Sequence, residues 1–183
     1  ITLFLLLKTG TQNWTPYNFS LLASAAEGVT GRFADYDYLH TSNHLLKEIA
    51  SKGYYSNSFH VPVDVSISSY EKIALESEFH SVCNGGCITY VEFSEMPASN
   101  TEAILDMVDY AFEKGCNYFG INFPLDNCTT CGHISRIGEA CPRCGGHDIK
   151  RLRRVSGYLA ESDRFTPGKY KEMLQRIGHD RIN

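Results

Sequence analysis

Four of the seven cysteines lie within 17 residues, as two pairs with the same internal spacing. Cys128 and Cys131 form the first C-x2-C pair, and Cys141 and Cys144 form the second after nine intervening residues. Two thiolates three positions apart on a tight turn can bind one ion, and two such turns facing each other give a tetrahedral site. The spacing therefore predicts a structural Zn²⁺ site, because four thiolates leave no open coordination position for catalysis.

The spacing alone leaves open which metal is bound, which ligands bind it and what the module does. A rubredoxin-like iron site uses the same four ligands, and His133 or His147 could replace one cysteine. Taken by itself, the motif is also typical of a zinc ribbon that binds nucleic acid. The net charge of -4 and the pI of about 6.0 argue against that last class, because no global basic field attracts a polyanion.

The remaining cysteines are Cys83, Cys87 and Cys116. An odd total without a signal peptide fits a reducing cytosol better than a secreted disulfide scaffold, which predicts a cytoplasmic protein. Cys83 and Cys87 flank a glycine-containing turn and could act as a redox pair, but we expect buried thiols there. Cys116 is expected to be a buried apolar residue.

Composition is that of a soluble globular protein, with 43% hydrophobic and 21% charged residues. It excludes disorder, collagen and coiled coil as the main class. The most apolar stretch, residues 1–7, is too short to span a bilayer, so we expect no membrane partner. The first residue is Ile1, which predicts that the chain is a fragment of a longer protein.

The central third of the chain has the pattern of a strand, a helix and a second strand. Residues 88–93 and 118–123 are apolar and β-branched runs, and Gly115 would stop the intervening helix. Residues 99–102 (Ser-Asn-Thr-Glu) have the spacing of a capping box at its start. This βαβ unit predicts an α/β fold with parallel strands in the first two-thirds of the chain.

Other elements are predicted with the same rules. We expect a helix over 37–52 and a strand over 54–63, while 1–8 fits a short strand or a helix end and 69–74 is ambiguous. Thr166 and Pro167 indicate the N-cap and first position of a final helix. Its packing face is predicted from four apolar side chains: Tyr170, Met173, Leu174 and Ile177.

The composition changes after Pro124. Residues 125–149 hold four cysteines but little apolar bulk, so they cannot form a core and need a metal. Residues 150–183 begin with a basic run and contain Gly157 between Ser156 and Tyr158. By itself, this glycine indicates only a turn or a close-packing position. The chain thus divides into an α/β part (1–124), a metal module (125–149) and a tail (150–183).

The order of these features resembles the class III anaerobic ribonucleoside-triphosphate reductases, which are glycyl radical enzymes. The segment R-V-S-G-Y-L follows the four-cysteine module within about thirteen residues, near the end of the chain. The resemblance extends over most of the sequence and includes Phe19-Ser20-Leu21-Leu22-Ala23, Ala26-Glu27-Gly28, Asn57-Ser58-Phe59-His60-Val61-Pro62, His80, Asn84-Gly85-Gly86 with Ile88-Thr89-Tyr90-Val91-Glu92, Tyr118-Phe119-Gly120-Ile121-Asn122-Phe123-Pro124, and Gly168-Lys169.

The resemblance implies that Gly157 is the radical residue. In the family, an activase with an iron–sulfur cluster and S-adenosylmethionine removes the α-hydrogen of this glycine. The glycyl radical oxidises a cysteine to a thiyl, which takes the ribose 3′-hydrogen of a ribonucleoside triphosphate, and formate or a thiol system supplies electrons. The thiyl cysteine and the regulatory regions would lie upstream of Ile1, so this chain would be the C-terminal part of a homodimeric enzyme.

The fold implied is the C-terminal portion of a ten-stranded α/β barrel, to which 1–124 would contribute strands. Two positions depart from the family. Some members have cysteine at the position of Ser156, and many have histidine at the position of Cys87. Glu27, Asn57 and His60 are candidates for the substrate cavity, with a buried hydrogen-bonded role as the alternative. The arginines of the basic run are expected to form salt bridges that seat the glycyl loop (Arg151, Arg153 and Arg154).

Two other functions stay open on the sequence. The chain could be a separate subunit that replaces an oxygen-cleaved glycyl radical terminus. It could also be a zinc-ribbon module that binds nucleic acid, which predicts salt-dependent polyanion affinity with no role for Gly157.

Overall fold

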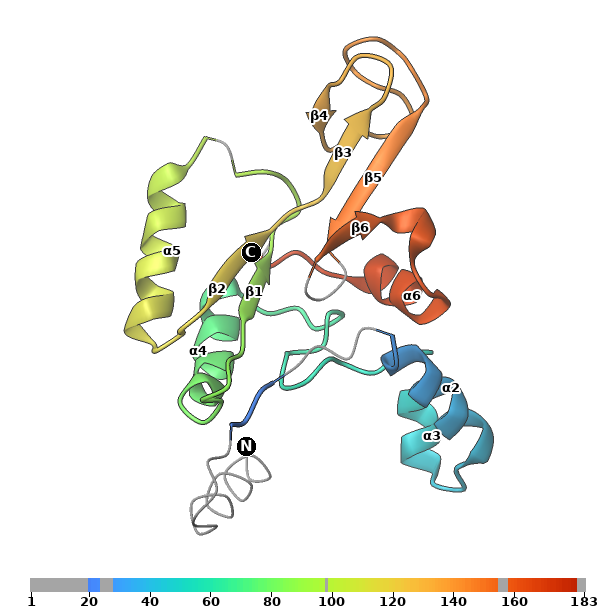
Figure 1. Cartoon of the computed structure of the whole chain (residues 1–183), viewed down its shortest axis with the longest axis vertical. Helices are drawn as coiled ribbons and strands as arrows, with labels where there is room; N and C mark the ends of the chain where they lie inside the picture. Colours follow the sequence, from blue (N-terminus) through green and yellow to red (C-terminus); the bar gives the residue numbers. More distant parts are fainter. Residues whose placement is uncertain (1–19, 24–27, 98, 155–157, 181–183) are drawn as a thin grey trace.

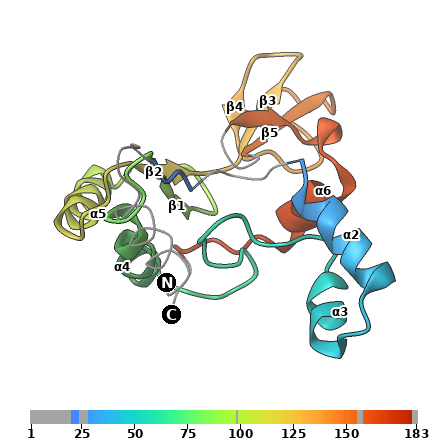
Figure 2. The ribbon, with the colours of Figure 1, turned by 60° about the horizontal axis from the view of Figure 1, so that its bottom comes forward.

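The computed structural model describes residues 20–23, 28–97, 99–154 and 158–180. Two small sheets organise this part of the chain (Figure 1). The first pairs β1 (Thr89–Glu92) with β2 (Phe119–Asn122), and the second has the order β4-β3-β5-β6. Helices α4 and α5 lie on one side of the molecule, while α2, α3 and α6 lie on the other (Figure 2). The predicted α/β class is confirmed.

The βαβ unit is present as predicted. Strands β1 and β2 are parallel, with Thr89 opposite Phe119, and α5 (Thr101–Glu113) connects them. Packing between the helices and the sheet buries one apolar cluster, formed by Ile73, Val91, Met107, Ala111 and Cys116. This cluster is the main apolar core of the described residues.

The predicted capping box at 99–102 is wrong in detail. Asn100 is the N-cap of α5, and its side chain accepts a hydrogen bond from the Ala103 amide (3.2 Å). A capping box does exist at α4 (Ser69–His80), where Ser68 and Glu71 exchange side-chain and backbone hydrogen bonds. The ambiguous 69–74 segment is therefore helical.

Two other element predictions are wrong. The helix predicted over 37–52 is two helices, α2 (Thr30–His40) and α3 (His44–Ala50), because Thr41 is extended and the Asn43 side chain caps α3. The strand predicted over 54–63 is irregular chain. Ser58 has a positive φ of 51°. The His60 amide donates a hydrogen bond to the Asn57 carbonyl (3.1 Å), which forms a turn in place of strand pairing.

The second sheet joins the metal module to the tail. Strand β3 (Leu125–Cys128) pairs with β4 (Ile134–Ser135) and with β5 (Ile149–Arg154), and β5 pairs with β6 (Leu159–Glu161). All of these pairings are antiparallel. Because β3 follows β2 after two residues, the second sheet is anchored directly to the first.

A short 3₁₀ helix, η1 (Ser162–Arg164), precedes α6 (Pro167–Gln175), which begins as predicted with Thr166 at the N-cap and proline at the first position. Its predicted packing face is wrong, because Leu174 is 65% exposed and Tyr170 46% exposed. The buried positions are Gly168, Lys169 and Glu172. Gly168 approaches Gly31 of α2 so closely that a Cβ on Gly168 would lie 2.7 Å from the Gly31 Cα.

Helix α4 carries a buried carboxylate, Glu76, that connects the helix to the irregular segment 54–63. Glu76 is 1% exposed, accepts a hydrogen bond from the Val61 amide (2.9 Å), and contacts Lys72 and His60. Burial raises the pKa of Glu76, but the hydrogen bond with His60 and the charge of Lys72 outweigh it and lower the pKa to about 2.

We predict that Glu76→Gln destabilises the protein by about 3 kcal/mol at pH 7, since a pKa depressed from 4.5 to about 2 corresponds to that free energy. The native carboxylate has the lower pKa, so its stabilisation is complete above about pH 5 and is lost as the pH falls toward 2. Urea unfolding of both proteins between pH 7 and pH 3 measures this, and a difference that stays constant over that range contradicts it.

Candidate metal centre and the strand beside it

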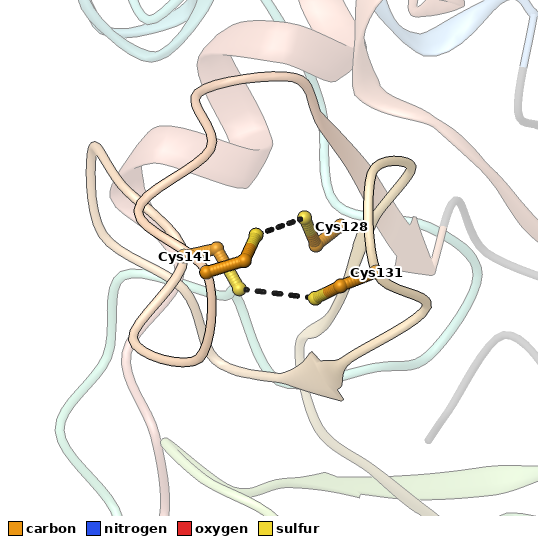
Figure 3. A group of neighbouring side chains, drawn as sticks. Cys128, Cys131 and Cys141 are labelled. Atoms are coloured by element: carbon orange, nitrogen blue, oxygen red, sulfur yellow. Dashed lines mark hydrogen bonds between the residues drawn. The ribbon is translucent and has the colours of Figure 1, made fainter.

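The four predicted cysteine ligands come together at one end of the second sheet. Their sulfur atoms all lie within 4.8 Å of one another, and Figure 3 shows the side chains of Cys128, Cys131 and Cys141 pointing toward a common centre. The Sγ atoms of Cys128 and Cys144 are 3.6 Å apart, and those of Cys131 and Cys141 are 3.7 Å apart. A tetrahedral Zn²⁺ with bonds of about 2.3 Å needs sulfur–sulfur separations of about 3.8 Å, so the geometry fits a metal ion.

Each C-x2-C pair is shaped by a turn that ends in glycine. The Gly132 amide donates to the Cys128 carbonyl, and the Gly145 amide donates to the Cys141 carbonyl, both at 2.8 Å. Both glycines have φ of +71°, a conformation that side chains with a Cβ rarely adopt. The two matching turns let the backbone bend back toward the sulfur atoms in a conformation that glycine adopts without strain.

The two histidines proposed as alternative ligands have other partners. His133 Nε2 lies 3.0 Å from the Ser135 hydroxyl, and His147 Nδ1 lies 3.0 Å from the Glu139 carbonyl. The metal-ligand group among the described residues contains the four cysteines and neither histidine. The all-thiolate set is therefore the one that the fold brings together.

The surroundings favour thiolate over thiol at the buried end of the centre. Cys128 is fully buried, and Cys141 is 2% exposed. Burial raises the pKa of Cys128, but hydrogen bonds from the Cys131 and Thr130 amides outweigh it and lower the pKa to about 6. Since the thiolate is the form that binds metal, the backbone prepares this position for a cation.

A buried carboxylate, Asp126, connects the metal module to β5. Asp126 is fully buried and accepts hydrogen bonds from Arg153 (2.6 Å), Arg151 (3.3 Å) and the Ile137 amide (2.8 Å). Arg151 also donates to the Ile137 and Gly138 carbonyls, at 2.8 and 2.6 Å. Asp126 thus holds β3, β5 and the loop between the two cysteine pairs in one arrangement.

The third arginine of the basic run, Arg154, pairs with Glu92 at the end of β1. The prediction that these arginines form salt bridges is confirmed, while their effect on the glycyl loop stays a prediction. Gly157 and Glu27 lie outside the described residues, so their positions are not part of the site described here. Sequence reasoning missed Asp126 and Glu92 as ion-pair partners, because single acidic residues within strands carry no spacing signal.

The other cysteines lie away from the metal centre and are buried. Cys83 and Cys87 pack together beneath Leu21 and Phe59, and Cys116 belongs to the main core. Burial raises the pKa of Cys87 to about 12 and also raises that of Cys116. The raised pKa values favour the protonated, less reactive form of the Cys87 and Cys116 thiols, which supports the buried-thiol interpretation of Cys87 over a redox pair.

The substrate-cavity candidates Asn57 and His60 line a small cavity of about 40 Å³, too small for a nucleotide. Asn57 is 7% exposed, and His60 contacts Glu76. Charged side chains from β1, β5 and the C-terminal segment complete the lining, among them Glu92, Arg154 and Arg176. Within the described chain, Asn57 is buried, whereas the His60 side chain is 22% exposed, so only Asn57 has the burial that the alternative role requires.

Comparisons with known proteins match this chain to one family. The model of the family described as anaerobic ribonucleoside-triphosphate reductase matches residues 8–179. The chain belongs to this family. The relatives include the anaerobic ribonucleoside-triphosphate reductases of Escherichia coli (34% identical) and of phage T4 (37% identical), each matched over 94% of this chain.

Solved structures agree on the fold. An anaerobic ribonucleotide reductase superposes with a TM-score of 0.74 at 19% identity, covering 98% of this chain and 28% of that one. The Thermotoga maritima enzyme gives 0.71 at 22% identity over 89% of this chain and 26% of its own, and it has also been solved with dATP in its specificity site. This chain spans 26% of the E. coli relative and 29% of the phage T4 relative.

In the described part of the chain, none of the helices combines the length and apolar character needed to cross a membrane.

We predict that the full-length protein binds one metal ion per chain and that Cys141→Ser lowers its bound metal at least tenfold, because three thiolates cannot complete the site. Cys87→Ser, which changes a buried thiol outside the centre, is the matched control and retains the metal. Elemental analysis after dialysis against a weak chelator measures both and separates zinc from iron. Equal metal content in wild type and Cys141→Ser argues against the site.

We also predict that Asp126→Asn retains the metal but destabilises the protein by about 3 kcal/mol, because two arginines lose a buried counter-charge. The control is Glu161→Gln, which removes the partly exposed ion pairs that Glu161 of the same sheet forms with Lys150 and Arg164, and it changes stability by less than about 1 kcal/mol. Chemical denaturation measures both variants. Equal effects of the two substitutions count against a connecting role for Asp126.

Proposed function

We propose that the complete protein is an anaerobic ribonucleoside-triphosphate reductase and that this segment supplies its radical residue, Gly157, and a structural zinc module. The observation that carries the proposal is the family match over residues 8–179, with the four-cysteine centre at one end of β5 and Gly157 three residues beyond the other end. The relatives from E. coli and phage T4 are anaerobic ribonucleoside-triphosphate reductases, which supports the same activity for the complete protein.

A zinc ion bound by the four cysteines would supply structural cross-linking and no catalysis, because four thiolates leave no open coordination position and Zn²⁺ has no redox chemistry. Cys128 lies opposite Ile149 in the β3–β5 pairing, so the centre fixes the start of β5. The pairs formed by Arg151, Arg153 and Arg154 then fix the rest of the strand. In this proposal, the metal centre and the ion pairs hold β5 in place and thereby position the chain that leads to Gly157.

Glycine suits the radical role chemically. Its Cα radical is planar and is delocalised over the neighbouring amide and carbonyl, and a Cβ would hinder both planarity and access. In the proposed cycle, an activase with an iron–sulfur cluster and S-adenosylmethionine first removes one hydrogen atom from the Gly157 Cα. The glycyl radical then takes a hydrogen atom from an upstream cysteine thiol, which restores the Cα–H bond and leaves a thiyl radical.

The thiyl radical would take the 3′-hydrogen of the ribonucleoside triphosphate, and the 2′-hydroxyl would leave as water. Two electrons from formate or a thiol system complete the reduction. Residues 1–124 would form part of a ten-stranded barrel around this reaction, and the likeness of fold to solved anaerobic reductases supports that placement. The upstream cysteine, a homodimeric assembly and a cytoplasmic location belong to the same proposal.

The nucleic-acid-binding alternative receives less support from the site. Its candidate arginines have protein partners: Arg151 and Arg153 pair with Asp126, and Arg154 pairs with Glu92. Phosphate contacts would have to compete with these ion pairs. Retention of the protein on a polyanion column at moderate salt would favour this alternative.

We predict that the full-length protein, incubated anaerobically with activase, reductant and S-adenosylmethionine, gives an organic-radical doublet in electron paramagnetic resonance. The Gly157→Ala variant gives no such signal and no deoxyribonucleotide, because the methyl group hinders formation of the planar radical. Exposure to air then cleaves the wild-type chain at Gly157, which mass spectrometry of the fragments detects. Full reductase activity in Gly157→Ala would refute the assignment.

A further inference from the structure

A buried cluster of charges surrounds Arg154, the last described residue before the 155–157 segment. We define the arginine clamp as Glu92, Arg154 and Arg176. These residues come from β1, β5 and the segment after α6, and their side chains are only 8%, 13% and 12% exposed. The proposed function uses Glu92 only as the ion-pair partner of Arg154 and assigns no role to Arg176.

The clamp holds both the side chain and the backbone of Arg154. The guanidinium pairs with the Glu92 carboxylate and lies over the Tyr90 ring, 4.1 Å from the ring centroid. Arg176 Nη1 donates to the Arg154 carbonyl (3.1 Å) and lies 3.6 Å from Glu92 Oε1. Arg154 therefore has little freedom to move relative to β1.

Arg176 is itself held in place from two directions. Its Nη2 donates to Glu172 Oε1 (2.9 Å), and the other oxygen of Glu172 accepts from Lys169 (2.6 Å). After α6 the chain returns to β1 (Figure 1), where the His179 amide donates to the Glu92 carbonyl (2.7 Å) and the Glu92 amide donates to His179 Nδ1 (2.8 Å). The C-terminal segment thus locks the clamp onto β1.

The Glu92 carboxylate stays ionised despite its burial. Burial raises the pKa of Glu92, but the Arg176 and Arg154 guanidiniums and a hydrogen bond from Asn122 lower it to about 2. Buried ion pairs are weak sources of stability, because apolar side chains of similar volume often stabilise a fold equally well. Their directional hydrogen bonds, in contrast, fix orientation, which points to a positioning role.

The geometry of β5 and β6 carries this positioning to the next residues. Arg154 lies opposite Leu159 in the β5–β6 pairing, so the two described residues that flank the connection between these strands are neighbours in the sheet. Gly157 lies three residues after Arg154, which limits the separation of their Cα atoms to about 10 Å. Whatever fixes Arg154 therefore fixes the base of the short connection that contains Gly157.

We propose that Glu92 and Arg176 are positioning residues for the radical glycine, acting through Arg154. This inference rests on the proposed function. Hydrogen-atom transfer requires reacting atoms within about 3–3.5 Å, and a misplacement of about 1 Å can lower the rate by about a hundredfold. Loosening the clamp therefore slows the transfer between Gly157 and the cysteine without removing either reactant.

The test compares Glu92→Gln, Arg176→Met and Arg176→Lys with wild type in the full-length, activated protein. The control is Glu161→Gln, which removes an exposed ion pair from the same sheet. Three quantities are measured: glycyl spins per chain, deoxyribonucleotide formed per spin, and the KM for the nucleotide. Circular dichroism and metal content report the folded fraction.

We expect product per spin to fall at least about tenfold in Glu92→Gln and Arg176→Met, with KM within about twofold of wild type. Arg176→Lys, which retains a donor and a positive charge, recovers most of the rate, and Glu161→Gln matches wild type. A merely structural role would lower spins and product together with the folded fraction and would leave product per spin unchanged.

Normal product per spin in folded Arg176→Met overturns the positioning role. If Glu92→Gln fails to fold, the comparison of Arg176→Met with Arg176→Lys decides the question alone, and equal product per spin in those two variants also overturns it. A wild-type protein that forms no glycyl radical with a competent activase refutes the proposed function itself. If instead the wild type is active and the clamp variants give the same product per spin, only the positioning role is refuted.

Discussion

The fully buried carboxylate of Asp126 is the interaction on which the geometry of the second sheet depends. Its two oxygens bind two arginines of β5 and the backbone of the loop between the cysteine pairs. A carboxylate removed from water is stable only when its charge is paired and its lone pairs are hydrogen-bonded, and all three partners are needed for that. Displacing any one of them therefore destabilises the others.

Apolar packing alone would not give the same arrangement. The cluster around the metal centre consists of Cys128, Ile137 and Cys141, with Cys131 and Ile149 packed against it. So small an apolar surface cannot offset the conformational entropy lost by the residues that form the module. Metal ligation and the Asp126 ion pairs supply interactions that are also directional, so they fix where β5 points as well as whether it forms.

The sequence predicted the features that depend on local spacing. The cysteine pairs, the βαβ unit and the Thr166–Pro167 helix start all follow from residues within a few positions of one another. The 54–63 segment has strand-like composition, but no strand of the described chain pairs with it. Composition alone therefore predicted a strand that does not form. β-propensity describes fit to a sheet and does not create the neighbouring strand.

The start of α6 was predicted correctly, but its packing face was not, for a related reason. Four apolar side chains at helical spacing suggested the packing face, whereas the close contact of Gly168 with Gly31 turns Lys169 and Glu172 inward. The clamp was also invisible in the sequence, because Glu92 and Arg176 are far apart along the chain and meet only after α6 returns the chain to β1. Long-range ion pairs leave no periodic signal.

The clamp addresses a problem that a radical glycine creates. A catalytic side chain can be held by contacts along its own length, but glycine has no side chain, and the Cα that would carry the radical is part of the backbone. Its position must therefore come from the residues on either side. Arg154 offers a long side chain and a carbonyl for this purpose, and both are bound by buried groups on other elements. In the proposed function, the metal centre fixes one end of β5 and the clamp fixes the other, so the glycine is positioned entirely through its neighbours.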